Sequence, residues 1–479
     1  MKSEFRQLLK IVNPENIISN ETDLLAYSRD LTPYLLKPDI VIFPESTKDV
    51  SEVLKFANKK KIPVTMRGSG ASFTGSSLPR KGGIVLDMSQ MNQIIKITPE
   101  DFICVAQPGV SLGELNNELI KYDCTFPHDI GSKDVSSLGG VVASDSHGHH
   151  GLKYGKVGNW IIGLEIVFAN GKIVKLGTNT LRNNCGFNLI RLFAGSQGTL
   201  CAITEITICI APLPKTSATI GIFFDEMKNV MSAVRAIIHA GVEPSAIELV
   251  DQFSLNVVND TLQLGFPKAE AMMITDIEAP DDDSLEKKVN VVKEMCTAHG
   301  GRDIQWSKDP KEMDILWLPR TAIDIAVAKT RAGYREVGFA IADPCVSLST
   351  MIDVMKKMRQ IFDEHDVLAA VFGHVGLGII HPAVFVKVGD SNEWTAAKRA
   401  EKEIVDLIAQ VGGTITGEHG IGLIKSRFVP AELGNSLDIM RAIKQLFDPN
   451  EILNPGKLCL DDLSFEEPPH SAYSKYTDE

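Results

Sequence analysis

The sequence has 479 residues, of which 44% are hydrophobic and 23% charged, and this predicts a soluble globular protein of two or three domains. The net charge is −12, from 49 basic against 61 acidic residues, and no strong block of lysine or arginine occurs, so no nucleic acid is expected as a partner. No apolar run approaches the ~20 residues of a membrane helix and no apolar signal core is present, so we expect no transmembrane segment and a cytoplasmic location, with the inner face of the membrane as the alternative.

The first part of the chain alternates between strand and helix patterns. A helix is predicted over residues 4–11. Two Ser-x-x-acid capping boxes, at Ser46 and Ser111, begin amphipathic helices. Short apolar runs predict strands over residues 39–43, 62–66, 83–87, 102–106, 160–168, 172–176 and 201–210.

The loop over residues 66–75, Met-Arg-Gly-Ser-Gly-Ala-Ser-Phe-Thr-Gly, follows the second of these strands. Its glycines permit positive φ angles and close approach of the backbone, so its N–H groups suit a pyrophosphate. The alternative for these residues alone is a Gly/Ser turn between strands. Because a strand rather than a helix follows the loop, the pattern counts against a Rossmann nicotinamide site.

Residues 126–155 form a long, polar, glycine-rich passage that includes His147, His149 and His150. Such a passage fits a backbone that wraps a large, flat, polar ligand; the alternative is an elaborate surface loop. From residue 214 onward, strands alternate with single helices, which predicts an antiparallel sheet covered on one face by helices. A last helix is predicted over residues 428–447, before an acidic tail that we expect to be poorly ordered.

Two glycine-rich stretches of the second part carry histidines. Residues 373–382 contain His374 and His381, and residues 412–422 contain Glu418 and His419. These side chains suit a divalent cation such as Zn²⁺, although their spacing alone is no metal motif and hydrogen-bonded core histidines are the alternative. Arg320 follows Trp317 and suits a carboxylate ligand, with a surface arginine on a helix as the alternative.

The order of these motifs resembles the FAD domain of the vanillyl-alcohol-oxidase superfamily, and within it the D-lactate/glycolate/D-2-hydroxyglutarate dehydrogenase branch. The resemblance covers residues 38–457 and implies an α+β fold. It implies a PCMH-type FAD-binding domain of two α+β subdomains (38–213), a ferredoxin-like antiparallel-sheet cap (214–423) and a C-terminal helical return (424–460). An N-terminal helical segment (1–37) precedes these domains, and the acidic tail (461–479) follows them.

The resemblance also implies an FAD site. The pyrophosphate would lie on Arg67, Gly68, Ser69, Gly70, Ala71, Ser72 and Gly75. The rest of the cofactor would lie on Ser132, Ser137, Gly139, Gly140, Ser144, Gly148, Ile203, Glu418 and Asn454. Ser69 stands where the family usually has a glycine. The family is usually poorer in histidine around residues 147–150, where a covalent flavin link is an alternative.

By the same resemblance, the chain would oxidise a small 2-hydroxy acid such as D-lactate or glycolate, with hydride transfer to flavin N5. Arg320 would bind the substrate carboxylate, and His419 would accept the hydroxyl proton, with His381 as the second candidate. His374, His381 and Glu418 would hold a divalent metal, Zn or Mn. Leu377 and Ile379 replace the usual Asp and Asn, which leaves the support of this site unassigned.

Eight scattered cysteines without a C-x-x-C pair argue against a disulfide frame or an iron–sulfur cluster in this chain. We therefore expect a separate electron acceptor: an iron–sulfur protein, an electron-transfer flavoprotein or a quinone. An oligomer is compatible with the sequence. Two alternatives remain: an FAD transferase like alkylglycerone-phosphate synthase, and a flavin-binding subunit of a multi-subunit glycolate oxidase.

Overall fold

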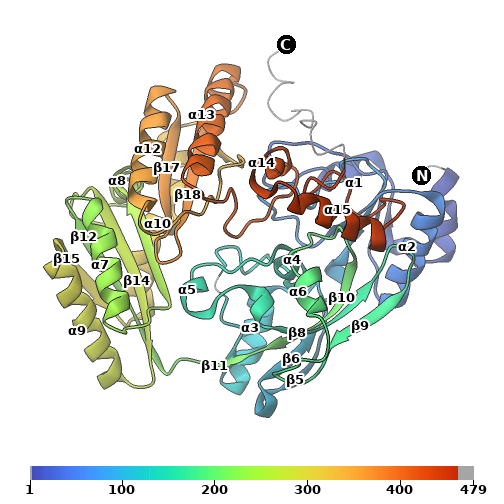
Figure 1. The fold of residues 1–479 in the computed structure, drawn as a ribbon, viewed down its shortest axis with the longest axis horizontal. Helices are drawn as coiled ribbons and strands as arrows, with labels where there is room; N and C mark the ends of the chain where they lie inside the picture. Colours follow the sequence, from blue (N-terminus) through green and yellow to red (C-terminus); the bar gives the residue numbers. More distant parts are fainter. Residues whose placement is uncertain (1–2, 129, 462–479) are drawn as a thin grey trace. The chain divides into compact units, whose positions relative to one another are not determined.

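The structure is a computed structural model that describes residues 3–128 and 130–461 (Figure 1). The expected acidic tail lies outside the described residues except for Asp461. Contacts divide the described chain into two compact units. The first unit comprises the chain up to His147, Lys156–Leu213 and the chain from Glu418; the second comprises Gly148–Gly155 and Pro214–Gly417. Among the described helices, none combines the length and apolar character that crossing a bilayer requires.

The first unit begins with a four-stranded sheet in the order β1-β2-β4-β3. Its elements are β1 (Ile17–Ile18), α1 (Glu21–Ala26), β2 (Ile40–Ile42), α2 (Thr47–Lys60), β3 (Val64–Arg67) and β4 (Ile84–Asp87). β4 runs parallel to both β2 and β3, and every side chain of β2 and β4 is buried, as is typical of parallel strands. The helix predicted at the N-terminus forms as a 3₁₀-helix over Ser3–Lys10.

A second sheet of five antiparallel strands has the order β5-β6-β10-β8-β9. Its strands are β5 (Ile94–Thr98), β6 (Ile103–Ala106), β8 (Ile161–Val167), β9 (Ile173–Gly177) and β10 (Ala202–Cys209), and β7 (Cys124–Thr125) pairs with β11 (Ala211–Pro212). Its helices are α3 (Leu112–Leu119), α4 (Leu138–Ser144) and α6 (Leu189–Phe193). α3 begins with the predicted capping box, in which Ser111 and Glu114 bond each other's backbone amides.

The C-terminal return consists of α14 (Val429–Leu433) and α15 (Ser436–Phe447), where the sequence predicts one helix. Gly434, at a φ of +51°, ends α14 and separates the two. The buried Lys444 ammonium fixes α15 to the rest of the unit. It donates hydrogen bonds to the carbonyl oxygens of Thr199 (2.8 Å) and Leu453 (2.7 Å) and to the carboxylate of Asp448 (2.6 Å).

The second unit contains a seven-stranded antiparallel sheet in the order β15-β12-β14-β13-β17-β18-β16. Its strands are β12 (Thr216–Phe224), β13 (Ala246–Asp251), β14 (Ala271–Ala279), β15 (Gly301–Ser307), β16 (Tyr334–Val337), β17 (Leu368–His374) and β18 (Ile379–Lys387). Its helices are α5 (Gly151–Tyr154), α7 (Lys228–His239), α8 (Gln252–Leu262), α9 (Asp282–Ala298), α10 (Pro310–Thr321), α11 (Ile323–Thr330), α12 (Met351–Glu364) and α13 (Ser391–Gln410).

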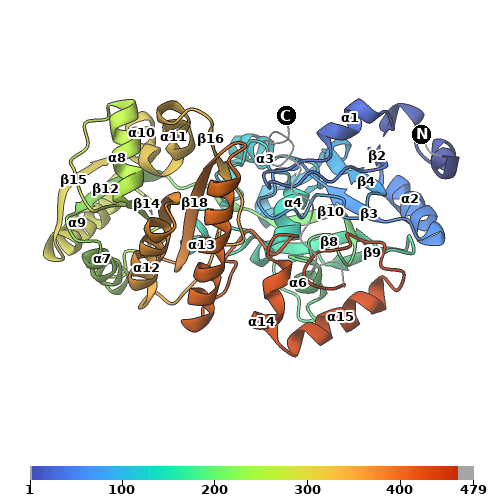
Figure 2. The ribbon, with the colours of Figure 1, turned by 90° about the horizontal axis from the view of Figure 1, so that it is seen from above.

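Helices cover both faces of this sheet, whereas the sequence analysis expected one covered face. Figure 2 shows α8, α10 and α11 on one side of the sheet and α7, α12 and α13 on the other. On the first of these faces, Phe223 and Leu316 belong to one buried cluster, and Phe372 and Ala326 to another. Two-sided burial explains why β12, β13, β14, β17 and β18, unlike the edge strands β15 and β16, read as nearly continuous apolar runs.

Candidate functional site

The predicted pyrophosphate loop follows β3 and leads into the parallel strand β4 without an intervening helix, as the sequence predicts. Gly70 and Gly75 have φ angles of +75° and +77°, values that favour glycine. The hydroxyl of Ser72 accepts hydrogen bonds from the amides of Thr74 and Ser76, so it stabilises the loop itself. Ser69 and Ala71 lie within the same loop.

Arg67, the last residue of β3, is buried at the start of this loop. Its guanidinium lies over the ring of Tyr27 at 5.6 Å, and its Nη2 donates to the carbonyl of Arg29 at 3.1 Å. Burial lowers the pKa of Arg67, while Asp87 opposes the shift. Nη1 is buried without a hydrogen-bond partner in the described part of the chain. Such an orphaned charged donor fits an anionic ligand.

Ser137 and its neighbours meet the pyrophosphate loop, although they lie far from it in sequence. Ser137 is the N-cap of α4, where its hydroxyl accepts a hydrogen bond from Gly140. A Cβ added to Gly68 would lie 2.2 Å from the Ser137 hydroxyl, so the Gly68 backbone approaches this side chain as only a glycine allows. A Cβ on Gly139 would similarly lie 2.5 Å from Pro108. The fold therefore brings two predicted FAD segments together in a cradle that a side chain would fill.

Asn454 joins the C-terminal return to this cradle. Its Nδ2 donates to the carbonyls of Ser76 (2.9 Å) and Gln197 (2.6 Å), while its Oδ1 is buried without a partner among the described residues. An unsatisfied buried acceptor beside the glycine loop suits a hydrogen-bond donor of a bound cofactor. The unpaired Nη1 of Arg67, the unpaired Oδ1 of Asn454 and the glycine cradle together fit FAD.

The other predicted cofactor residues are distributed between the two units. Ser132 bonds Ser136, the Ser144 hydroxyl donates to the Gly140 carbonyl one turn earlier in α4, and Ile203 lies buried in β10. All of these belong to the first unit, whereas Gly148 belongs to the second.

Glu418 and His419 open the last segment of the first unit. A Glu418 carboxylate oxygen lies 3.3 Å from Nδ1 of His147 and the other lies 3.6 Å from Nε2 of His419. The His419 ring stacks on Phe73, with centroids 5.2 Å apart, which places the predicted base beside the pyrophosphate loop. His147 thus joins the two residues that the sequence analysis proposed.

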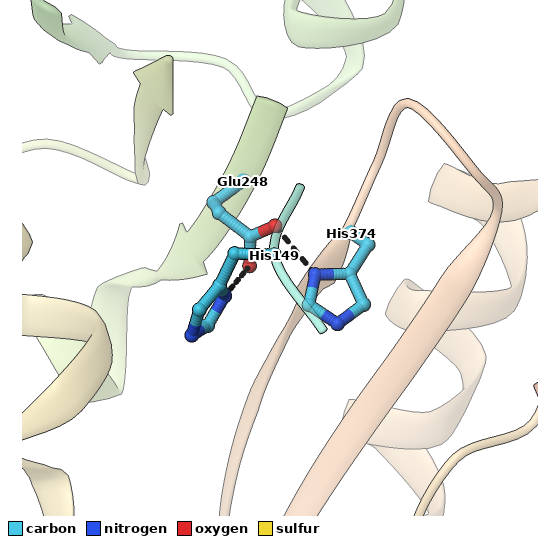
Figure 3. Close-up of side chains that lie close together, drawn as sticks. All are labelled: His149, Glu248 and His374. Atoms are coloured by element: carbon cyan, nitrogen blue, oxygen red, sulfur yellow. Dashed lines mark hydrogen bonds and ion pairs between the residues drawn. The ribbon is translucent and has the colours of Figure 1, made fainter. Parts of the chain in front are cut away.

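In the second unit, the side chains of His149, His374 and Arg320 surround Glu248, a residue of β13 that was not predicted from the sequence. Figure 3 shows Glu248 with the two histidines. Its carboxylate is fully buried, and it receives hydrogen bonds from Nδ1 of His374 at 2.5 Å and from Nε of Arg320 at 3.0 Å. Nδ1 of His149 lies 3.8 Å away. Burial alone would raise the pKa of Glu248, but the two histidines and the guanidinium hold it well below its usual range.

His374 and His381 lie side by side on β17 and β18, with ring centroids 4.9 Å apart. Nδ1 of His381 lies 2.9 Å from the carbonyl of Ala342, just as Nδ1 of His374 faces Glu248. Since a carbonyl and an ionised carboxylate only accept hydrogen bonds, we assign the ring proton of both histidines to Nδ1. Both Nε2 atoms then carry the lone pair that a metal ion needs, so the donor pair fits a divalent cation.

The side chains of Leu377 and Ile379 are apolar and form no hydrogen bonds to these histidines. Leu377 lies in the turn between β17 and β18, where its amide bonds the His374 carbonyl at 2.9 Å, and Ile379 is buried against Gly417. The Nδ1 atom of His374 instead contacts Glu248 of β13, and that of His381 contacts the carbonyl of Ala342. The third predicted metal ligand, Glu418, belongs to the first unit, so the second unit by itself brings together two of the three.

Arg320 is a residue of α10, and two contacts fix the position of its guanidinium. Its guanidinium lies over the ring of Phe372 at 4.1 Å, and its Nε binds Glu248. In the part of the chain that the structure describes, Glu248 is its only hydrogen-bond partner, so both terminal nitrogens keep their donors for a ligand. Two parallel N–H groups match the oxygens of a carboxylate.

Comparison with known proteins places the chain in a family. A family model described as "FAD binding domain" matches residues 38–177, and one described as "FAD linked oxidases, C-terminal domain" matches residues 213–458. The chain is 32% identical to "Glycolate oxidase subunit GlcD" of Bacillus subtilis (strain 168), over 95% of this chain and 96% of that protein. It is 30% identical to "D-lactate dehydrogenase (cytochrome), mitochondrial" of Arabidopsis thaliana, over 91% of this chain and 74% of that protein.

The fold is similar to that of p-cresol methylhydroxylase, solved with substrate bound, at a TM-score of 0.78 and 16% identity, over 96% of this chain and 98% of that chain. The expected α+β, PCMH-type architecture is thereby confirmed, as is the family resemblance. The chain belongs to the FAD-linked oxidases and is an FAD-linked oxidoreductase of the glycolate oxidase and D-lactate dehydrogenase type.

Proposed function

We propose that this protein oxidises a small 2-hydroxy acid, such as D-lactate or glycolate, to the 2-oxo acid. The observation that carries the proposal is Arg320, whose two terminal nitrogens are open to a carboxylate while its Nε is fixed on Glu248. The relatives named for glycolate oxidase and D-lactate dehydrogenase support the same class of substrate. FAD, when bound, supplies the acceptor for the hydride that leaves C2.

We assign metal binding and proton acceptance to the histidines. His374 and His381 each direct a lone pair from Nε2, and with Glu418 they would hold Zn or Mn, which acidifies a hydroxyl bound to it. His419 is our candidate for accepting the hydroxyl proton, since imidazole is the side chain that most often acts as a general base. His381 remains the second candidate for that role, because its lone pair serves either a metal or a proton.

The electrons would leave through a separate acceptor. The eight cysteines lie singly along the sequence, without a C-x-x-C pair that would hold a cluster. An iron–sulfur protein, an electron-transfer flavoprotein or a quinone would therefore complete the reaction.

Anaerobic mixing of the purified flavoprotein with a panel of D- and L-2-hydroxy acids tests the proposal. We expect one acid to bleach the flavin absorbance rapidly, and Arg320→Lys to raise the acid concentration needed for half-maximal bleaching about 10-fold or more, because the forked donor pair is lost. Bleaching by no acid, together with turnover of an acyl-glycerone phosphate, would overturn the dehydrogenase in favour of the transferase.

A further inference from the structure

Glu248 is the only residue of the described chain that bonds both Arg320 and His374, two groups to which the proposed function gives separate tasks. We propose that Glu248 is a positioning residue that fixes the substrate-binding arginine and the metal-binding tautomer of His374 with one buried carboxylate. This inference rests on the proposed function for the tasks of its two partners. The contacts themselves do not depend on it.

The sheet register places Glu248 directly opposite His374. The two residues are a cross-strand pair of β13 and β17, so their side chains point to the same face of the sheet. Phe372 lies two residues before His374 on β17 and therefore shares that face, where Arg320 stacks on it. The pairing of two strands thus determines which histidine receives the carboxylate and where the arginine lies.

Each carboxylate oxygen serves one partner. Oε1 accepts from Nδ1 of His374, and Oε2 accepts from Nε of Arg320. The first bond keeps the proton on Nδ1, so the lone pair stays on Nε2. The second bond uses Nε, which leaves both terminal nitrogens for an end-on bidentate carboxylate complex.

A cation bound directly by the cluster is the competing interpretation. His149, Glu248 and His374 offer three ligand atoms within 4.8 Å of one another. However, Arg320 already neutralises the single negative charge of Glu248, and a divalent ion there would leave two positive charges uncompensated in a buried place. The 2.5 Å contact between Glu248 and His374 is also a hydrogen-bond distance, with a proton between the atoms.

The test compares Glu248→Gln with Asp251→Asn in the flavin-loaded protein. Asp251 is a matched control: it is a buried carboxylate of the same strand and bonds an arginine, Arg359, at 2.6 Å, away from His374. The glutamine has only one acceptor oxygen, so it can accept a hydrogen bond from His374 or from Arg320 but not from both. We expect Glu248→Gln to weaken zinc binding in a chelator competition 10- to 100-fold, and to weaken acid binding without an equal fall in the limiting rate of flavin reduction. Asp251→Asn should change neither affinity.

Two readouts are independent of the substrate. Nitrogen NMR of labelled histidines, assigned with His374→Gln, should show the wild-type His374 protonated on Nδ1 and a changed tautomer in Glu248→Gln. If the wild-type ring carries its proton on Nε2, the inference is wrong, even if Glu248→Gln fails to fold. The inference would also be wrong if Glu248→Gln bound zinc and the acid as tightly as Asp251→Asn does. If no acid reduces the wild-type flavin, the proposed function fails, while the tautomer measurement still decides the role of Glu248.

Discussion

Gly68→Ala is the sharpest test of the cofactor cradle. The glycine has no positive φ, so the effect of the methyl group is steric alone. The new Cβ would lie 2.2 Å from Oγ and 3.3 Å from Cβ of Ser137, and the first distance is impossible for two non-bonded atoms. The hydroxyl must therefore leave its place beside the Gly140 amide, now 3.3 Å away, and α4 loses its N-cap.

The expected cost has two sources. Losing the cap costs ~1 kcal/mol, and overpacking that the loop cannot relax brings the total to about 1–3 kcal/mol. Denaturant unfolding measures this cost, and the ratio of flavin to protein absorbance measures cofactor occupancy. We expect Gly68→Ala to lower both the stability and the occupancy, because Gly68 and Ser137 are both predicted FAD residues and the clash disturbs their contact.

Ser137→Ala supplies the control. It removes the clashing oxygen and leaves only the 3.3 Å contact, which a small shift relieves. Gly68→Ala should therefore cost about 1 kcal/mol less in the Ser137→Ala background than in the wild type, a coupling that a double-mutant cycle resolves. Additive effects of the two changes would refute the steric explanation.

Three further predictions concern the first unit. Burial lowers the pKa of Lys457 from 10.5 to about 7, so between these pH values the unfolded chain binds one more proton than the folded chain. In urea unfolding, the stability of the wild type relative to Lys457→Met should therefore rise with pH across this window by up to ~1.4 kcal/mol per pH unit, whereas the exposed Lys60→Met should show no such slope. Lys444→Met leaves the buried Asp448 carboxylate without its charge partner and should lower the free energy of unfolding, measured by calorimetry, by about 3–5 kcal/mol. The double variant Lys444→Met/Asp448→Asn should regain part of this stability, and a double variant no more stable than Lys444→Met would contradict the pairing. Ser46→Ala should cost ~1 kcal/mol by uncapping α2 while leaving flavin occupancy unchanged; a loss of flavin would count against a purely local cap.

Local signals explain which elements the sequence predicts. α2 and α3 begin at predicted capping residues because a cap depends on side chains within one turn. β5, by contrast, has mostly exposed or half-buried side chains and lacks the apolar run that marks a buried strand. α10 contains Pro319, which usually ends a helix, and this concealed its extent.

Less of the candidate functional site than of the fold could be predicted from the sequence. The glycine loop, His374, His381 and Arg320 were selected from short sequence patterns together with the family resemblance, but Glu248 stands 126 residues before its partner His374. Only the pairing of β13 with β17 brings them together, and a single sequence does not reveal that register. One signal existed: Glu248 is a lone carboxylate in the apolar run Ala-Ile-Glu-Leu-Val, and a buried charge requires partners.

The charges of the second unit predict that the acid and the cation help each other to bind. Glu248 and Arg320 form a neutral pair. A substrate carboxylate that takes the guanidinium donors adds one negative charge, which attracts the divalent ion that the proposed function places on His374, His381 and Glu418. Linkage then requires that each ligand tighten the other by the same factor, ~5-fold or more.

Manganese titrations with and without the 2-oxo acid product measure that factor, since the product carries the carboxylate but is not oxidised. Arg320→Gln should abolish the coupling while retaining manganese binding, because the histidine pair is left in place. Equal manganese affinities with and without the product in the wild type would show that the two ligands do not share this charge balance.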